Sequence, residues 1–212
     1  MRNKAQLPTG LYGITAEKFS VGRTNLEVAK AMIDAGVHVI QYREKRPAKS
    51  YRQILEECMA LRRLTRDAGV MFIVNDYADV ALLAEADGVH VGQDDLPVAA
   101  VRRLIGDERL IGVSTHSPEQ ARQAVADGAD YIGVGPIFPT STKEDVCAPV
   151  GLDYLEYVVD SMTIPFVAIG GIKLTNIDQV VARGAKTVCL VTEIVGAPDI
   201  GARIRELQEK IV

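Results

Sequence analysis

The chain has 212 residues, of which 48% are hydrophobic, and a formal net charge of −4. This composition supplies the core of one domain of α/β-barrel size and excludes a disordered chain, while the negative charge argues against a nucleic-acid-binding protein. No apolar run approaches the roughly 20 residues that a membrane span requires. The three cysteines lack the spacing of a zinc site or a disulfide framework. Because no secretory signal is apparent either, we expect a cytoplasmic protein that does not contact membranes.

Short β-branched runs alternate with longer amphipathic segments along the chain. The runs occupy residues 11–15, 37–41, 71–75, 88–92, 110–114, 131–135, 165–169 and 187–191. The segments between them have helical periodicity, for example over 25–35, 50–68 and 117–127, and several end on a glycine just before the next run. This alternation is typical of repeated βα units with a parallel sheet.

Eight βα units are the number that closes a barrel. We therefore predict a single (β/α)₈ TIM-barrel domain of the α/β class over residues 1–212. An open doubly wound sheet is the structural alternative. It would place a glycine-rich turn after the first strand, and the sequence Ile14-Thr15-Ala16-Glu17 offers none.

Polar residues and glycines follow almost every run. In barrels of this kind the active site lies at the carboxyl ends of the strands, so this clustering predicts an enzyme. The residues concerned are Gln41, Arg43, Lys45, Asn75, Asp76, Asp94, Asp95, Ser114, His116, Thr140, Thr142, Lys143, Gly170, Gly171 and Thr192. Two other histidines, His38 and His90, lie within runs and are expected to pack there.

The acidic residues of this set predict a cation site. Asp76 and one of Asp94 and Asp95 follow neighbouring strands, and carboxylates completed by waters and substrate phosphate are the usual ligands of Mg²⁺. The sequence leaves both Asp94 and Asp95 open. A structural interpretation also exists for each, since Asp76 could stabilise a turn and the other two could cap the following helix.

The basic residues of the set predict phosphate binding. Arg43, Lys45 and Lys143 offer a planar donor fork and two mobile charges, although the first two could also belong to a solvated strand end. Further donors are the hydroxyls of Thr140 and Thr142, in the long 136–150 connection, and the backbone of Gly170-Gly171.

Five segments resemble the thiamine-phosphate synthase family. They are QYREK at 41–45, VNDYADVALLAEADGVHVGQDDLP at 74–97, IGVSTHS at 111–117, GPIFPTSTK at 135–143 and IGGI at 169–172. The combination of GPIFPTSTK with QYREK is highly specific, whereas IGGI is common to many phosphate-binding barrels. The resemblance covers essentially the whole chain.

The resemblance implies a Mg²⁺-dependent transferase. Members of the family join 4-amino-2-methyl-5-pyrimidinylmethyl diphosphate to the nitrogen of 4-methyl-5-(2-phosphooxyethyl)thiazole and release diphosphate. The implied pyrimidine diphosphate ligands are Gln41, Arg43, Lys45, Asn75, Ser114 and Lys143, the implied metal ligands are Asp76 and Asp95, and the implied thiazole phosphate ligands are Thr140, Thr142, Gly171, Val191 and Thr192. Among them Arg43, Lys45, Lys143 and Ser114 are expected to be catalytic. The expected partners are these two small molecules, with a homo-oligomer possible.

Two positions depart from the family pattern, namely Tyr77, where arginine is frequent, and Glu193, which adds a negative charge beside the expected thiazole phosphate site. Three functional alternatives remain at this stage. A thiazole tautomerase-like isomerase on the same barrel would need an acid/base residue, for which His116 is the candidate. Another phosphate-binding barrel isomerase is favoured only by the glycine features. A non-catalytic phosphate-binding relative would normally have lost part of the charged set, which is complete here.

Overall fold

A ring of eight parallel strands forms the centre of the computed structural model, which describes residues 6–142 and 147–211. The strands are β1 (Gly10–Ile14), β2 (Val39–Tyr42), β3 (Met71–Asn75), β4 (Gly88–Val91), β5 (Leu110–Thr115), β6 (Tyr131–Val134), β7 (Phe166–Ile169) and β8 (Thr187–Leu190). They pair in chain order, and β1 also pairs with β8, so the sheet closes. The predicted TIM barrel is therefore confirmed, and the open sheet is excluded.

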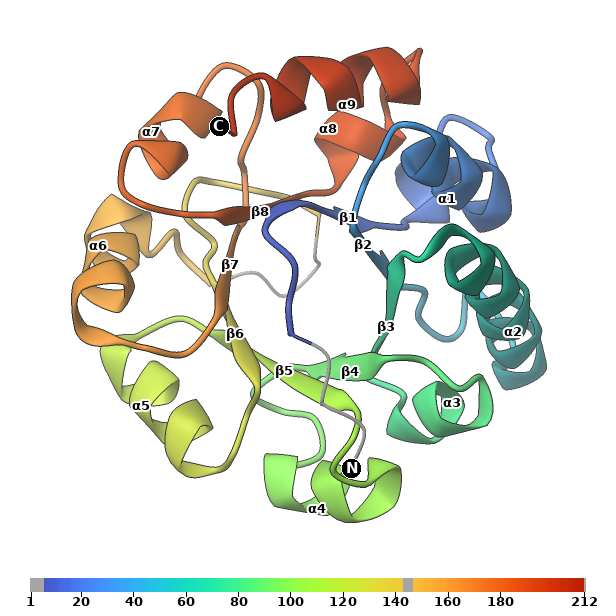
Figure 1. Ribbon diagram of the computed structural model, residues 1–212, viewed down its shortest axis with the longest axis horizontal. Coiled ribbons are helices and arrows are strands. Elements are labelled where there is room, and N and C mark those ends of the chain that lie inside the picture. Colours follow the sequence, from blue (N-terminus) through green and yellow to red (C-terminus); the bar gives the residue numbers. More distant parts are fainter. Residues whose placement is uncertain (1–5, 143–146, 212) are drawn as a thin grey trace.

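Helices surround this ring on the outside (Figure 1). They are η1 (Glu17–Phe19, a 3₁₀ helix), α1 (Asn25–Asp34), α2 (Tyr51–Ala68), α3 (Ala78–Leu83), α4 (Val98–Ile105), α5 (Pro118–Ala126), α6 (Gly151–Ser161), α7 (Ile177–Val181), α8 (Thr192–Val195) and α9 (Ile200–Gln208). Local sequence sets several boundaries. Thr24 and Ser50 form capping boxes at the starts of α1 and α2, and Gly69 ends α2 in the left-handed conformation with φ 69°. Among the described residues, none of these helices is long and apolar enough to cross a lipid bilayer.

Two hydrophobic layers result from the alternation of side chains along the strands. The larger layer fills the space between strands and helices, and the smaller one fills the barrel interior. The interior layer includes Tyr12, Tyr131 and Cys189, and Leu7 packs against it. Leu7 belongs to the segment that leads into β1 and crosses the barrel opening in Figure 1. Because this segment lies at the amino ends of the strands, it leaves the carboxyl ends open for a site.

Candidate active site

A cavity of about 1060 Å³ opens at the carboxyl ends of the strands, and all eight strands contribute to its wall. The lining contains every predicted site residue that the structure describes, namely Gln41, Arg43, Lys45, Asn75, Asp76, Asp94, Asp95, Ser114, Thr140, Thr142, Gly171, Val191 and Thr192. Lys143 lies outside the described residues. Predicted site residues up to 151 positions apart in the sequence, from 41 to 192, therefore line the same cavity. We call the opening of this cavity the mouth of the barrel.

The acidic side of the mouth is built around Asp76. This residue adopts a left-handed conformation with φ 62°, and its backbone N–H donates to the carbonyl of His90 at 2.8 Å. Its carboxylate lies 3.2 Å from the ammonium of Lys45. Burial raises the pKa of Asp76, Lys45 lowers it, and the neighbouring carboxyl of Asp95 raises it further. Two neighbouring carboxylates that repel each other are chemically suited to bind a cation.

The two consecutive aspartates differ in their surroundings. Asp95 acts on the pKa of Asp76, and its carboxylate accepts a hydrogen bond from the Gly92 N–H at 2.6 Å. Asp94 lines the cavity as well, but it is not among the groups with the largest effects on the pKa of Asp76. The geometry therefore favours Asp95 over Asp94 as the partner of Asp76.

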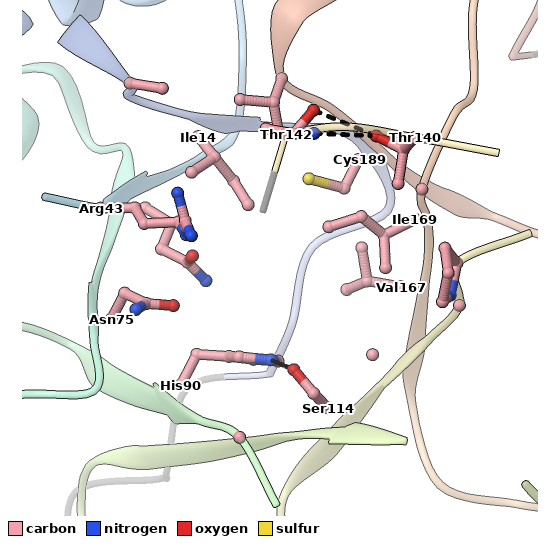
Figure 2. A pocket seen from close by; sticks show the side chains of 18 of the residues that line it. Ile14, Arg43, Asn75, His90, Ser114, Thr140, Thr142, Val167, Ile169 and Cys189 are labelled. Atoms are coloured by element: carbon pink, nitrogen blue, oxygen red, sulfur yellow. Dashed lines mark hydrogen bonds between the residues drawn. The ribbon is translucent and has the colours of Figure 1, made fainter. Parts of the chain in front are cut away.

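The basic side of the mouth follows β2. The Arg43 N–H donates to the Thr15 hydroxyl at 3.2 Å, and its side chain lies on the cavity wall between Ile14 and Asn75 (Figure 2). The buried Nε of Arg43 has no hydrogen-bond partner among the residues that the structure describes. A guanidinium that lines a cavity and keeps an unpaired Nε is suited to an anion.

The loop that carries Lys45 is attached at its far end by Lys49. The Lys49 ammonium contacts the carboxylates of both Glu17 and Glu57. Glu57 also accepts hydrogen bonds from the Tyr42 hydroxyl at 2.8 Å and from the Asn25 amide at 3.0 Å. This cluster joins the loop to α1, α2 and η1, and it fixes the backbone that presents the basic residues.

The opposite side of the mouth is formed by the loops after β6, β7 and β8. The hydroxyls of Thr140 and Thr142 lie 3.1 Å apart (Figure 2). Gly171 has φ 64°, and a Cβ on it would lie 2.5 Å from the Pro139 carbonyl oxygen, so only glycine allows the two loops to touch. This side offers hydroxyl and backbone donors and no described carboxylate in its lining.

Glu193 does not add its charge to this side. Its carboxylate contacts the guanidinium of Arg203 on α9 and accepts a hydrogen bond from the Leu174 N–H at 3.3 Å. The side chain is 17% exposed and is not part of the cavity lining. The first-turn glutamate of α8 is therefore neutralised on the outer side of the barrel.

The floor of the cavity contains His90. This histidine lies within β4 and packs against Tyr131 as expected, but its side chain faces the barrel interior, where its Nε2 lies 2.9 Å from the Ser114 hydroxyl (Figure 2). The neighbours Val89 and Val91 are buried on the helix side, and strand alternation turns His90 inward. That Val-His-Val alternation was the signal available in the sequence. The expectation for His38 is wrong, since this residue precedes β2 and is exposed.

His116, the acid/base candidate of the isomerase alternative, bridges two loops. Its Nδ1 donates to the Gly135 carbonyl, and its backbone N–H donates to the Gln120 side chain at 2.7 Å. These contacts give His116 a structural role at the edge of the mouth.

Comparison with known proteins identifies the family. The model of the family described as thiamine monophosphate synthase matches residues 11–194. A thiamine-phosphate synthase of Pelotomaculum thermopropionicum is 63% identical over 203 residues, which cover 95% of this chain and 92% of that protein. One from Lawsonia intracellularis is 54% identical over 208 residues, covering 98% and 95% respectively.

A solved structure agrees with these relatives. The thiamine phosphate pyrophosphorylase from Pyrococcus furiosus superposes with a TM-score of 0.86 at 34% identity, and the match covers 95% of this chain and 94% of the other. The 3-hexulose-6-phosphate synthase structure, with a TM-score of 0.70 and 20% identity, shares the fold. With a family match over most of its length and relatives above half identity, the chain belongs to the thiamine monophosphate synthase family.

Proposed function

We propose that this chain is a thiamine-phosphate synthase. It would transfer the 4-amino-2-methyl-5-pyrimidinylmethyl group from its diphosphate to the nitrogen of 4-methyl-5-(2-phosphooxyethyl)thiazole. The observation that carries the proposal is one cavity with two separate sets of anion-binding groups. Arg43 and Lys45 lie on one side, and Thr140, Thr142 and Gly171 lie on the other. One set suits a diphosphate and the other a phosphate monoester. The relatives from Pelotomaculum thermopropionicum and Lawsonia intracellularis, both thiamine-phosphate synthases, support the overall activity.

The acidic pair suits Mg²⁺ as the cofactor. The repulsion between Asp95 and Asp76 would be relieved by a divalent cation between them. No group of three or more metal-ligating side chains gathers within residues 6–142 and 147–211, so two carboxylates would leave positions for waters and diphosphate oxygens. When bound, Mg²⁺ would supply charge neutralisation for the leaving diphosphate.

The chain's own residues would promote departure of the diphosphate. The bond between the exocyclic methylene carbon and the diphosphate oxygen breaks with both electrons going to the oxygen, while the pyrimidine amino group donates electron density to the methylene. Arg43, Lys45 and, by its place in the sequence, Lys143 would stabilise the negative charge that develops on the leaving group. The thiazole nitrogen then forms the new bond with its lone pair. The reaction needs no protein nucleophile.

The apolar part of the cavity would protect the reactive carbon from water. Ile14, Val167 and Ile169 face the cavity beside the polar residues in Figure 2. Such walls accommodate flat heteroaromatic rings and hold the two substrates in one orientation. Water capture of the electron-poor methylene would otherwise compete with attack by the thiazole.

The direct test is a reaction of the purified protein with Mg²⁺ and both substrates. Thiamine phosphate and diphosphate should appear in a one-to-one ratio. If neither product forms while the protein remains folded by circular dichroism, the proposed function is wrong. Rearrangement of a thiazole substrate without any pyrimidine diphosphate present would instead favour the isomerase alternative.

A further inference from the structure

We propose that Tyr12, Tyr131 and His90 are positioning residues that form a directional hydrogen-bond chain across the barrel floor. This hydrogen-bond chain links the Gln41 amide to the Ser114 hydroxyl and makes Ser114 a hydrogen-bond donor toward the pyrimidine. This inference rests on the proposed function, since it concerns how the same cavity selects the heteroaromatic ring of its substrate.

The five side chains form an unbroken series. The Gln41 Nε2 lies 2.8 Å from the Tyr12 hydroxyl, which lies 3.1 Å from the Tyr131 hydroxyl. The Tyr131 hydroxyl lies 3.1 Å from Nδ1 of His90, whose Nε2 lies 2.9 Å from the Ser114 hydroxyl. The residues come from β2, β1, β6, β4 and β5, so the series spans the interior of the barrel. Gln41, Tyr12 and Tyr131 are at most 2% exposed, so bulk water does not compete for these contacts.

Counting protons gives the series a direction. An amide NH₂ group can only donate, so the Tyr12 oxygen accepts from Gln41. We infer that its single proton goes to Tyr131, because in the reverse direction the Tyr12 oxygen would accept two hydrogen bonds. Tyr131 then gives its own proton to Nδ1 of His90. With Nδ1 accepting, a neutral His90 carries its proton on Nε2 and donates it to Ser114. The Ser114 proton is therefore directed to a ligand in the cavity.

The protonation states support this direction. Burial raises the pKa of both Tyr12 and Tyr131, so each phenol keeps its single proton at neutral pH. Each hydroxyl can then donate only one hydrogen bond.

The backbone makes room for the series at one glycine. A Cβ on Gly112 would lie 2.1 Å from Cζ of Tyr131 and 2.5 Å from Nδ1 of His90. The contact between these two rings therefore requires glycine at this position in β5. Their centroids lie 5.4 Å apart, and the hydroxyl and Nδ1 meet in the space that a side chain would occupy. The Tyr131–His90 contact is thus specified by the glycine at position 112 and does not follow from hydrophobic packing alone.

The consequence is a fixed pattern of donors and acceptors before substrate arrives. A ring nitrogen of an aminopyrimidine accepts from Ser114, while the amide oxygen of Gln41 remains an acceptor for an amino group. Rotating the serine or the amide to the opposite pattern would require every member of the series to reverse. The hydrogen-bond chain therefore keeps the polar contacts for the pyrimidine preorganised.

Histidine tautomers in the substrate-free protein provide the first test. The chain has three histidines, so ¹⁵N-labelled wild type and a His90→Asn variant are enough to assign the His90 nitrogens by NMR. We expect neutral His90 with the proton on Nε2, and a mixture of tautomers in Tyr131→Phe. A proton on Nδ1 in the wild type, or an unchanged tautomer in Tyr131→Phe, overturns the proposal. Because no substrate is present, this result is independent of whether the protein makes thiamine phosphate.

Kinetics provide the second test, with a matched control. Tyr154 is also buried, and its hydroxyl donates to Thr115 at 2.7 Å outside the cavity. Loss of one buried hydrogen bond corresponds to about a three- to tenfold effect. We expect Tyr131→Phe to raise the KM for the pyrimidine diphosphate by that factor and to leave the KM for the thiazole phosphate within about twofold.

The control separates positioning from a loss of folded protein. We expect Tyr154→Phe to change neither KM, because a reduced fraction of active enzyme lowers only the apparent kcat. Equal KM values for the pyrimidine diphosphate in Tyr131→Phe and Tyr154→Phe would overturn the proposal. Tyr12→Phe, which interrupts the same series one residue earlier, should reproduce the effect of Tyr131→Phe.

Discussion

Replacement of Lys49 by methionine tests whether the ion-pair cluster behind β2 holds the basic loop. The substitution keeps the length of the side chain but removes its charge, and Glu17 and Glu57 lose their shared partner. Breaking a fully buried ion pair costs about 3–5 kcal/mol, whereas an exposed pair contributes about 0–1 kcal/mol. The exposed fractions are 13% for Lys49, 37% for Glu17 and 22% for Glu57, which place this cluster between the limits. We therefore expect a loss of about 2 kcal/mol.

Thermal and chemical unfolding measure this loss. For a domain of this size, about 2 kcal/mol corresponds to a decrease in Tm of about 4–8 °C. Burial lowers the pKa of Lys49, but its hydrogen bonds with Glu17 and Glu57 outweigh burial, so the net pKa is raised. A raised lysine pKa means that the stabilisation is complete below the ordinary value of about 10.4 and is lost as pH rises through the folded-state pKa. The loss of unfolding free energy in Lys49→Met should therefore be constant from about pH 6 to about pH 9.

Lys30→Met is the matched control. The Lys30–Asp34 pair is also a lysine–carboxylate contact, 3.1 Å long and within α1, but its side chains are 68% and 62% exposed. Such a pair contributes about 0.5 kcal/mol or less. We also expect Lys49→Met, but not Lys30→Met, to raise the KM for the pyrimidine diphosphate, because only the former anchors the loop of Lys45. Equal Tm values for the two variants would refute this interpretation of the cluster.

Three further outcomes are expected. Gly171→Ala should raise the KM for the thiazole phosphate, because its Cβ would lie 2.5 Å from a backbone oxygen. Gly69→Ala is the control: its φ of 69° is similar but the space around it is open, so it should only lower Tm. Equal KM values for the two variants would contradict this prediction. His116→Ala should reduce kcat by less than about tenfold, since it removes a loop contact and no proposed chemistry; a complete loss would restore His116 as an acid/base residue. Mg²⁺ affinity, measured by calorimetry, should weaken as pH falls, because burial raises the pKa of Asp76 and protons then compete with the metal; a pH-independent affinity would exclude Asp76 as a ligand.

The sequence predicts the barrel well because its signals are local. Each strand is a β-branched run bounded by a glycine or a polar residue, so the third run, at residues 71–75, coincides with Met71–Asn75. The second run, predicted at 37–41, is shifted to Val39–Tyr42, since strand ends depend on pairing with neighbours. The site residues of the described segments lie together because every strand end contributes to the same mouth.

Contacts between distant strands are the part that local patterns do not provide. Tyr12 and Tyr131 are 119 positions apart, and both read as ordinary aromatic core residues in their runs. Only closure of the barrel brings their hydroxyls together and gives them polar partners. Tyr77 illustrates the same limit, because its packing depends on Tyr51, which lies 26 positions earlier in the sequence. The two rings meet edge to face with centroids 5.5 Å apart, beside the loop of Lys45.

A Mg²⁺ titration of the coupling reaction with Asp95→Asn and Asp94→Asn tests the central claim most directly. Both variants remove one carboxylate from consecutive positions of the mouth, but Asp95 is the one with a large effect on the pKa of Asp76. We expect Asp95→Asn to lose most thiamine phosphate formation and to require much more Mg²⁺, while Asp94→Asn stays near the wild type. Wild-type rates for Asp95→Asn at every Mg²⁺ concentration would contradict a metal-bound diphosphate at this end of the barrel.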